Sequence, residues 1–167
     1  MTKTEKHQQR IVTAHHEAAH AVHFVSIGWR LDYVMIRRTT GVTKPRVNRG
    51  HIPTRRRIVQ RLVNELCGPQ SEYVFFGLRA KNQHDWLKPF QAARILYGAR
   101  TDKEAIPLVL IWFKRAGRFV RGHRAAIRRV ANALIVQGRL NDRQVRALCR
   151  RRARDHFSES SRSPRSL

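Results

Sequence analysis

The chain has 167 residues, of which 35 are Lys or Arg and only 11 are Asp or Glu, so its formal net charge is +24. This length suits one domain, and a hydrophobic fraction of 41% is too high for a disordered chain. A membrane-spanning helix needs about 18 consecutive apolar residues, and every apolar run in this sequence is much shorter. The first residues are not followed by the apolar stretch of a secretory signal peptide. Two cysteines are too few for a disulfide framework. We therefore expect a cytoplasmic domain over residues 1–157, without a membrane span, and a disordered Ser/Arg-rich tail over 158–167.

The positive charge comes mostly from arginine, whose guanidinium binds phosphate through two parallel hydrogen bonds. Non-specific binding to nucleic acid is one interpretation, and a general drift of composition towards arginine is the other, because the basic residues spread over the whole chain. No helix-turn-helix or zinc-finger spacing occurs. The aromatic residues do not alternate with arginine as in a single-strand platform, and Trp29, Trp86 and Trp112 are expected in the core.

Apolar residues recur at helical spacing through most of the chain, which predicts a mainly α (α+β) fold, a helix bundle with one or two short strands. A strand is expected over Leu31–Arg38, and Thr39–Pro53 is a loop or a weak hairpin. Gly68 and Pro69 are expected to interrupt the helical run. The predicted helices are Glu5–Ile27, Arg55–Leu66, Gln70–Phe76, Asp85–Tyr97, Thr101–Ala116, Phe119–Gln137 and Asn141–Phe157.

The first helix contains the motif His16-Glu17-Ala18-Ala19-His20. Residues four apart lie on one face of a helix, so His16 and His20 can reach one zinc ion. Glu17 lies to one side of the pair, where it can act as the base towards a zinc-bound water. His15 and His23 lie on other faces and are expected to have structural roles. The alternative is a polar helix face with incidental histidines, but the small and apolar neighbours indicate a buried helix.

A catalytic zinc site usually has three protein ligands, so a third residue is needed. Spacing alone does not choose among the candidates. These are the histidines His7, His51, His84, His123 and His156 and the carboxylates Glu65, Glu72 and Asp85.

Several segments together resemble the FtsH-type zinc metalloproteases. The helix segment Thr13–Val22 is similar to the family's H-E-A-G-H-A-V helix, and the segment from Leu66 to Glu72, followed by Phe75-Phe76-Gly77, is similar to its L-A-G-R-A-A-E…F-G segment. Gln83-His84-Asp85-Trp86 stands where the family has N-D-[LI], and Val120–Leu148 is similar to its closing helices. The likeness covers roughly residues 10–150.

The resemblance implies a zinc peptidase in which His16, His20 and Asp85 bind Zn²⁺ and Glu17 is the catalytic base. It implies that Glu72 supports the site, either by orienting a ligand imidazole or as a helix ion pair. It also implies peptide or unfolded-protein substrates and a homo-oligomer, because the family assembles as rings. The family's AAA+ ATPase module is missing and no G-x-x-x-x-G-K-[ST] loop occurs, so a separate ATPase would be needed to unfold substrates.

Three functions remain open on these grounds. The first is a zinc-dependent metallopeptidase, acting alone or with a separate unfoldase. The second is a catalytically weak or inactive, protease-derived basic module that binds nucleic acid. The third is a small cytosolic H-E-x-x-H peptidase of the regulator-cleaving kind that mobile elements encode, which would share the zinc pair and differ in the third ligand.

Overall fold

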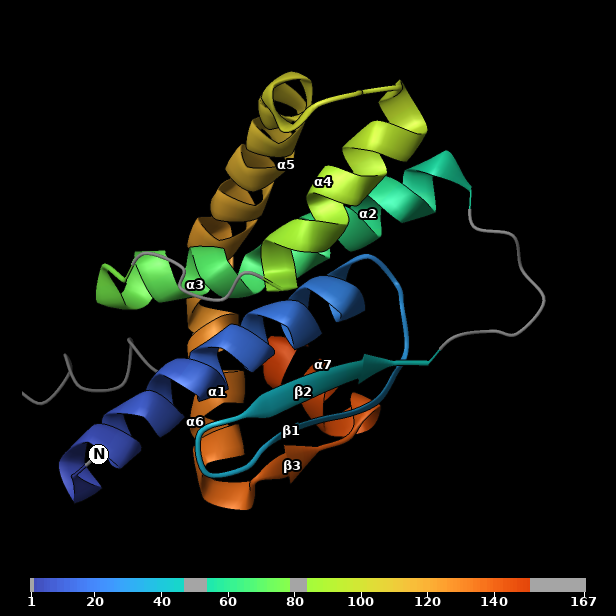
Figure 1. Ribbon diagram of the computed structural model, residues 1–167. Helices are drawn as coiled ribbons and strands as arrows, with labels where there is room; N and C mark the ends of the chain where they lie inside the picture. The colour runs from blue at the N-terminus through green and yellow to red at the C-terminus, as the bar shows by residue number, and fades with distance from the viewer. Residues whose placement is uncertain (1, 47–53, 79–83, 151–167) are drawn as a thin grey trace, which may run out of the picture.

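The computed structural model describes residues 2–46, 54–78 and 84–150, with only the backbone for residues 84 and 85 (Figure 1). The predicted mainly α (α+β) class is confirmed, since helices dominate and a small antiparallel sheet joins them. The helices are α1 (Lys3–Ser26), α2 (Arg55–Glu65), α3 (Cys67–Phe76), α4 (His84–Tyr97), α5 (Asp102–Gly122), α6 (Arg124–Gln137) and α7 (Asp142–Arg150). The strands are β1 (Leu31–Ile36), β2 (Gly41–Pro45) and β3 (Arg139–Leu140).

The sheet has the strand order β2-β1-β3, so β1 is central and Val34 faces Thr43 on one side and Leu140 on the other. The weak hairpin considered for the segment after β1 is present as β2. The expected one or two strands become three, because two residues after the left-handed Gly138 pair with β1. A strand this short leaves no periodicity in the sequence from which it could be predicted.

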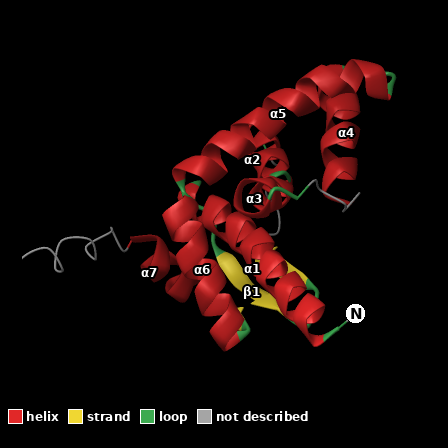
Figure 2. Ribbon diagram, turned by 90° about the vertical axis from the view of Figure 1, so that its left-hand side faces the viewer, coloured by secondary structure: helices red, strands yellow, loops and turns green. Residues whose placement is uncertain are grey.

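Helix α1 forms the centre of the molecule, with α6 and α3 packed against it and the sheet on another side (Figures 1 and 2). Every residue from 12 to 24 is buried, although this stretch holds four histidines and a glutamate. Ala18, Ala19 and Ala21 have no exposed surface, which lets the neighbouring elements approach the helix closely. Polar side chains on such a helix need partners, because an unpaired buried polar group is costly.

The break predicted between the second and third helices is present, at Leu66, but two predicted boundaries are wrong. Gly68 and Pro69 lie in the first turn of α3 and not in the break, because proline in the first turn has no helical N–H bond to lose. Helix α5 continues beyond Ala116 to Gly122, since the buried stripe through Val109 and Trp112 extends to Val120. The last helix is described only to Arg150, so its predicted end and the predicted tail lie outside the described residues.

The two ends of the molecule are built from different secondary-structure elements. The sheet, α1, α6 and α7 lie at one end, while α4 and the first half of α5 lie at the other, with α2 and α3 between them (Figures 1 and 2). Among the described helices, none has the length and apolar content that crossing a membrane requires. Cys67 is buried, as expected of a structural thiol, and burial raises its pKa well above the usual range.

Candidate metal centre

His16 and His20 lie side by side on α1, as their spacing predicts. Their ring centroids are 4.8 Å apart with an interplanar angle of 70°. The exposed fractions are only 8% for His16 and 9% for His20, so both imidazoles are largely out of water. Two imidazoles one helical turn apart and shielded from solvent form a pair that a single metal ion can bridge.

The Nε2 atoms of both rings converge on one point in front of Gly68, near the start of α3. A methyl group added to this glycine would lie within 2.5 Å of His16 Nε2 and of His20 Nε2. Real Cβ atoms essentially never make contacts that short, so any larger residue at this position would have to displace the two rings. The two nitrogens therefore face one small volume that the α3 backbone leaves open, and this convergence fits a shared metal ion.

The other nitrogen of each ring is held by an oxygen atom. His16 Nδ1 lies 2.7 Å from Glu72 Oε1, and His20 Nδ1 lies 2.8 Å from the Asn64 carbonyl oxygen. A carbonyl oxygen only accepts, so the His20 Nδ1–H donates and the lone pair of the neutral ring belongs to Nε2. Burial, together with the neighbouring His16, lowers the pKa of His20 and favours this neutral form. Oxygen partners on Nδ1 orient metal-binding imidazoles in many sites.

Glu17 is held on the β2 side of α1. Its Oε2 lies 2.7 Å from the Thr43 hydroxyl, which also lies 3.0 Å from the Glu17 carbonyl oxygen. Its side chain packs on Gly41, where an added methyl would fall within 2.9 Å of three Glu17 side-chain atoms. Glu17 is 7% exposed, and its side chain contacts two residues of one strand, Gly41 and Thr43. Glu17 thus contacts β2, whereas the two Nε2 atoms face Gly68 of α3.

A cleft of about 800 Å³ opens beside these groups. Among the described residues lining it, none is Lys or Arg, although such residues make up 35 of 167 in the chain. The carboxylates of Glu5, Glu17 and Glu72 all line it. The described lining residues are Glu5, Gln8, Gln9, Val12, Thr13, His16, Glu17, Thr39, Thr40, Gly41, Glu72, Phe76 and Leu78.

The other histidines of α1 lie on different faces, as expected, and have structural partners. His15 Nδ1 lies 3.0 Å from the Ile11 carbonyl oxygen, and its ring packs on Phe75 at 4.8 Å. His23 Nδ1 lies 3.2 Å from Asn64 Nδ2, and its ring meets Phe119 edge-on at 4.8 Å. Burial lowers the pKa of His15, and burial together with nearby histidines lowers that of His23 to about 4.

None of the four candidate third ligands whose side chains are described is placed as a third ligand. Glu72 binds the Nδ1 side of His16, which is the orienting position and not the metal-binding one. Glu65 is paired with Lys88 at 3.0 Å, and His123 packs on the Phe119 ring at 4.0 Å. His7 is exposed near the start of α1.

Asp85 lies in the first turn of α4, and its side chain is outside the described part, as are the side chain of His84 and all of His51 and His156. Within the described residues, no group of three His, Cys, Asp or Glu side chains suited to a metal is found. The assignment of Asp85 as third ligand stays a prediction.

Four residues of the site were not found from the sequence. Asn64 was not singled out, because it lies within the apolar stripe of α2. It is 2% exposed, and its side chain contacts both the His20 carbonyl oxygen and His23. Gly68 was interpreted as a helix breaker, and Gly41 and Thr43 as loop residues. Asn64 could have been noticed as a polar residue on the predicted buried face of its helix. The roles of Gly68, Gly41 and Thr43 depend on contacts between distant segments, which the sequence does not reveal.

No protein-family model matches the chain, and a search of curated proteins finds no match. The case for a function therefore rests on the residues and on their geometry.

Proposed function

We propose that the protein is a zinc-dependent metallopeptidase whose chain corresponds to the peptidase part of the FtsH type. The observation that carries the proposal is the convergence of His16 Nε2 and His20 Nε2 in front of Gly68, with Glu17 fixed one residue away. His16 and His20 would hold the zinc ion, and Asp85 is the proposed third ligand. When bound, zinc lowers the pKa of a coordinated water to about 7 and polarises a substrate carbonyl group.

The protein's own residues supply the proton transfers and the orientation of the site. Glu17 accepts the proton of the attacking water and delivers it to the leaving amine, as a general base and then a general acid. The Thr43 hydroxyl holds Glu17 Oε2 at 2.7 Å and so restricts the carboxylate to one position. Glu72 fixes the His16 ring through Nδ1 at 2.7 Å, and the Asn64 carbonyl fixes the His20 ring at 2.8 Å.

The edge of the sheet supports an extended peptide as substrate. One edge of β2 pairs with β1, and no strand among the described residues pairs with its other edge. An extended peptide can add to such an edge through main-chain hydrogen bonds. Because Thr43 of β2 holds Glu17, a peptide on this strand would pass close to the base. Folded proteins expose few extended segments that are not already paired, so a separate unfoldase would be needed for most of them.

The test is peptide hydrolysis by the wild-type protein and by Glu17→Gln. The zinc-loaded wild type should cleave an unstructured protein such as β-casein without ATP. Glu17→Gln should keep its zinc, because Glu17 is not a ligand, and should lose at least about a hundredfold in rate, since general acid–base catalysis contributes about 10² to 10⁴. Full activity of Glu17→Gln with zinc bound would overturn the proposal.

A matched control separates the base from general damage to α1. His15→Gln changes a buried polar side chain of the same helix that does not belong to the zinc pair. This variant should keep both zinc and hydrolysis. Loss of zinc in His15→Gln but not in His20→Ala would mean that the metal is bound elsewhere.

A further inference from the structure

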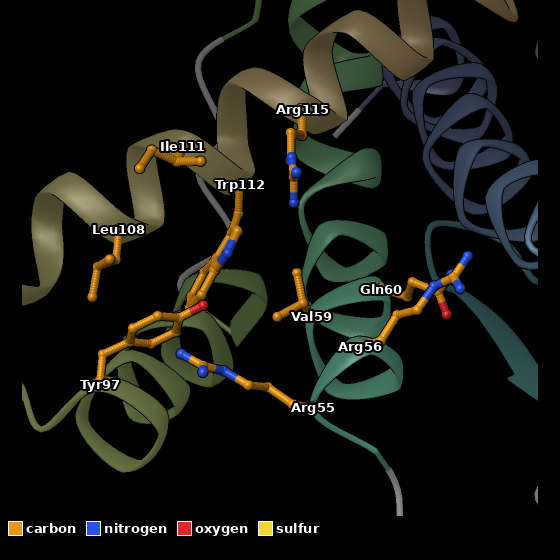
Figure 3. Close-up of a pocket in the computed structure, with 9 residues that line it drawn as sticks. All are labelled: Arg55, Arg56, Val59, Gln60, Tyr97, Leu108, Ile111, Trp112 and Arg115. Atoms are coloured by element: carbon orange, nitrogen blue, oxygen red, sulfur yellow. The ribbon is translucent and has the colours of Figure 1, made fainter.

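A second hollow lies between α2, α4 and α5, at the end of the molecule away from the sheet (Figures 1 and 3). Its volume is about 610 Å³. The described residues that line it include no Asp or Glu, and three are arginines. They are Arg55, Arg56, Val59, Gln60, Tyr97, Leu108, Ile111, Trp112 and Arg115.

Two of these arginines present their guanidinium groups to the hollow. Arg55 lies over the Tyr97 ring, with its guanidinium carbon 4.7 Å from the ring centroid, and Arg115 extends from α5 towards α2 (Figure 3). Arg56 points to the outer side of α2, beside Gln60 (Figure 3). Within the described residues, no carboxylate forms an ion pair with Arg55 or Arg115. Stacking on Tyr97 orients Arg55 in advance, which reduces the entropy lost when it binds an anion.

The first turn of α2 is positively charged, which is unfavourable at the N-terminus of a helix. Arg55, Arg56 and Arg57 fill its first turn, which contains no acidic residue. The positive end of the helix dipole favours anions and opposes cations at these positions. The N-terminal backbone is already capped, because Thr54 Oγ1 accepts from Arg57 N at 3.3 Å. The arginines therefore cost helix stability, and an anion bound between Arg55 and Arg115 would relieve that cost.

The wall of the hollow between the two arginines is apolar and accessible. Tyr97 is 42% exposed and Ile111 is 54% exposed, while Trp112 lies buried beneath them with its ring 6.0 Å from that of Tyr97. A free phosphate or an acidic side chain would satisfy the arginines and leave this wall in water. A nucleotide unit satisfies both, since its phosphate matches the guanidinium fork and its base has a flat apolar face.

We propose that this hollow binds a strand of single-stranded nucleic acid. Arg55 and Arg115 contact the phosphates, and an unpaired base lies against Tyr97 and Ile111. The net charge of +24 adds non-specific attraction for the rest of the strand. The sequence separates the arginines of α2 from Tyr97 by some forty positions, and the fold brings them together. The proposal does not depend on peptide hydrolysis.

The first test compares two variants of equal net charge, +22, in the full chain. Arg55→Gln/Arg115→Gln removes the guanidiniums of the hollow, and Arg143→Gln/Arg150→Gln removes two exposed arginines of α7 at the other end of the molecule. Binding to a fluorescein-labelled dT 12-mer is measured by anisotropy at several salt concentrations. The hollow variant should bind roughly tenfold more weakly at 50 mM salt, and its log–log salt slope should fall by about 1.4, at 0.7 per lost phosphate contact. Equal weakening in both variants would overturn the proposal.

The second test asks whether a base is recognised. Tyr97→Leu keeps an apolar side chain and the charge but removes the ring. It should weaken binding of the dT 12-mer about fivefold or more beyond its effect on an abasic 12-mer, because the abasic strand loses only the orientation of Arg55 and not the base stacking. An equal effect on both strands would contradict base contact. Equally tight binding of poly-glutamate of the same length, or of duplex DNA, with the same response to the variants would overturn a single-stranded ligand.

Folding and activity serve as the controls. Arg55→Gln/Arg115→Gln should melt close to the wild-type temperature, because removing the unfavourable charge of Arg55 from the start of α2 offsets the loss of its contact with the Tyr97 ring. Zinc-dependent hydrolysis of β-casein by this variant should equal that of the wild type, because the cleft beside His16 shares no described lining residue with the hollow. Binding lost together with thermal stability would reassign the two arginines to folding.

Discussion

The cleft beside His16 and the hollow beside Tyr97 are built from opposite groups. Three glutamates and no described Lys or Arg line the cleft, whereas three arginines and no described carboxylate line the hollow. The His16 and Glu17 side chains of the cleft are buried, and each is held by a hydrogen-bond partner, Glu72 on His16 and Thr43 on Glu17. The two arginines that face the hollow are exposed and have no described ion-pair partner.

This contrast in charge and burial is the one expected for the two proposed sites. A reaction site needs few atoms in fixed positions, so its groups are buried and each is restrained by a hydrogen bond. A site for a polyanion needs charge and accessible apolar surface, and its side chains can adjust to the ligand. In a chain with only 11 acidic residues, the presence of three in one cleft is informative.

The largest effect is expected from Gly68→Ala. The added methyl would occupy the volume on which His16 Nε2 and His20 Nε2 converge, so zinc binding and peptide hydrolysis should both be abolished. Zinc content by mass spectrometry and the thermal shift on adding zinc report the loss directly. Gly122→Ala is the matched control, since nothing lies within 4 Å of its added methyl, and it should keep zinc and gain about 0.5 to 1 kcal/mol of stability. Full zinc occupancy in Gly68→Ala would remove the pair as the metal site.

Gly41→Ala should separate the base from the metal. Its methyl would collide with the Glu17 side chain and push the carboxylate out of its position against Thr43. A displacement of about 1 Å costs on the order of a hundredfold in rate, while the zinc pair is untouched. Zinc content equal to that of the wild type, with hydrolysis reduced about a hundredfold, is the expected result. Unchanged hydrolysis would show that the position of Glu17 does not limit the reaction.

A smaller effect is expected from Glu72→Gln. The amide can still accept a hydrogen bond from His16 Nδ1, but it no longer carries the charge that strengthens the imidazole as a ligand. Zinc affinity, measured by competition with a chelator, should fall about ten- to a hundredfold. Hydrolysis should return when zinc is in excess. Activity that stays low at saturating zinc would assign Glu72 a direct part in the reaction.

The sequence and the structure agree where local patterns decide the outcome. The helical periodicity of α1 and the spacing of His16 and His20 depend on neighbours within one turn, so both could be predicted. Gly68 and Thr43 could not be assigned, because their roles depend on α3 and β2 packing against α1 from distant parts of the chain. The hollow beside Tyr97 was missed for the same reason, since its arginines and aromatic rings come from three helices. Trp112 is in the core as predicted, whereas Trp29 and Trp86 are only partly buried.

The last prediction concerns stability at acid pH, which should depend on the buried histidines of α1 and not on the arginines of the hollow. His23 is buried and its pKa is lowered to about 4, whereas an unfolded histidine titrates near 6.5. Between these values the unfolded state binds the extra proton, so stability is full above pH 6.5 and falls as the pH drops towards 4, by about 3 kcal/mol. Denaturant unfolding of the metal-free protein measures this loss. His23→Phe keeps a ring against Phe119 and should reduce the pH dependence, with the remainder coming from His15 and His20. An unchanged slope in this variant would exclude His23 as a source.

The arrangement of His16 and His20 around one metal ion is tested most directly by X-ray absorption at the zinc edge of the reconstituted protein. We predict two imidazole nitrogens at about 2.0 to 2.1 Å with oxygen ligands completing the shell, and loss of the imidazole signal in His16→Ala/His20→Ala. A spectrum with sulfur at about 2.3 Å, or an imidazole signal that persists in this double variant, would contradict the proposed metal centre.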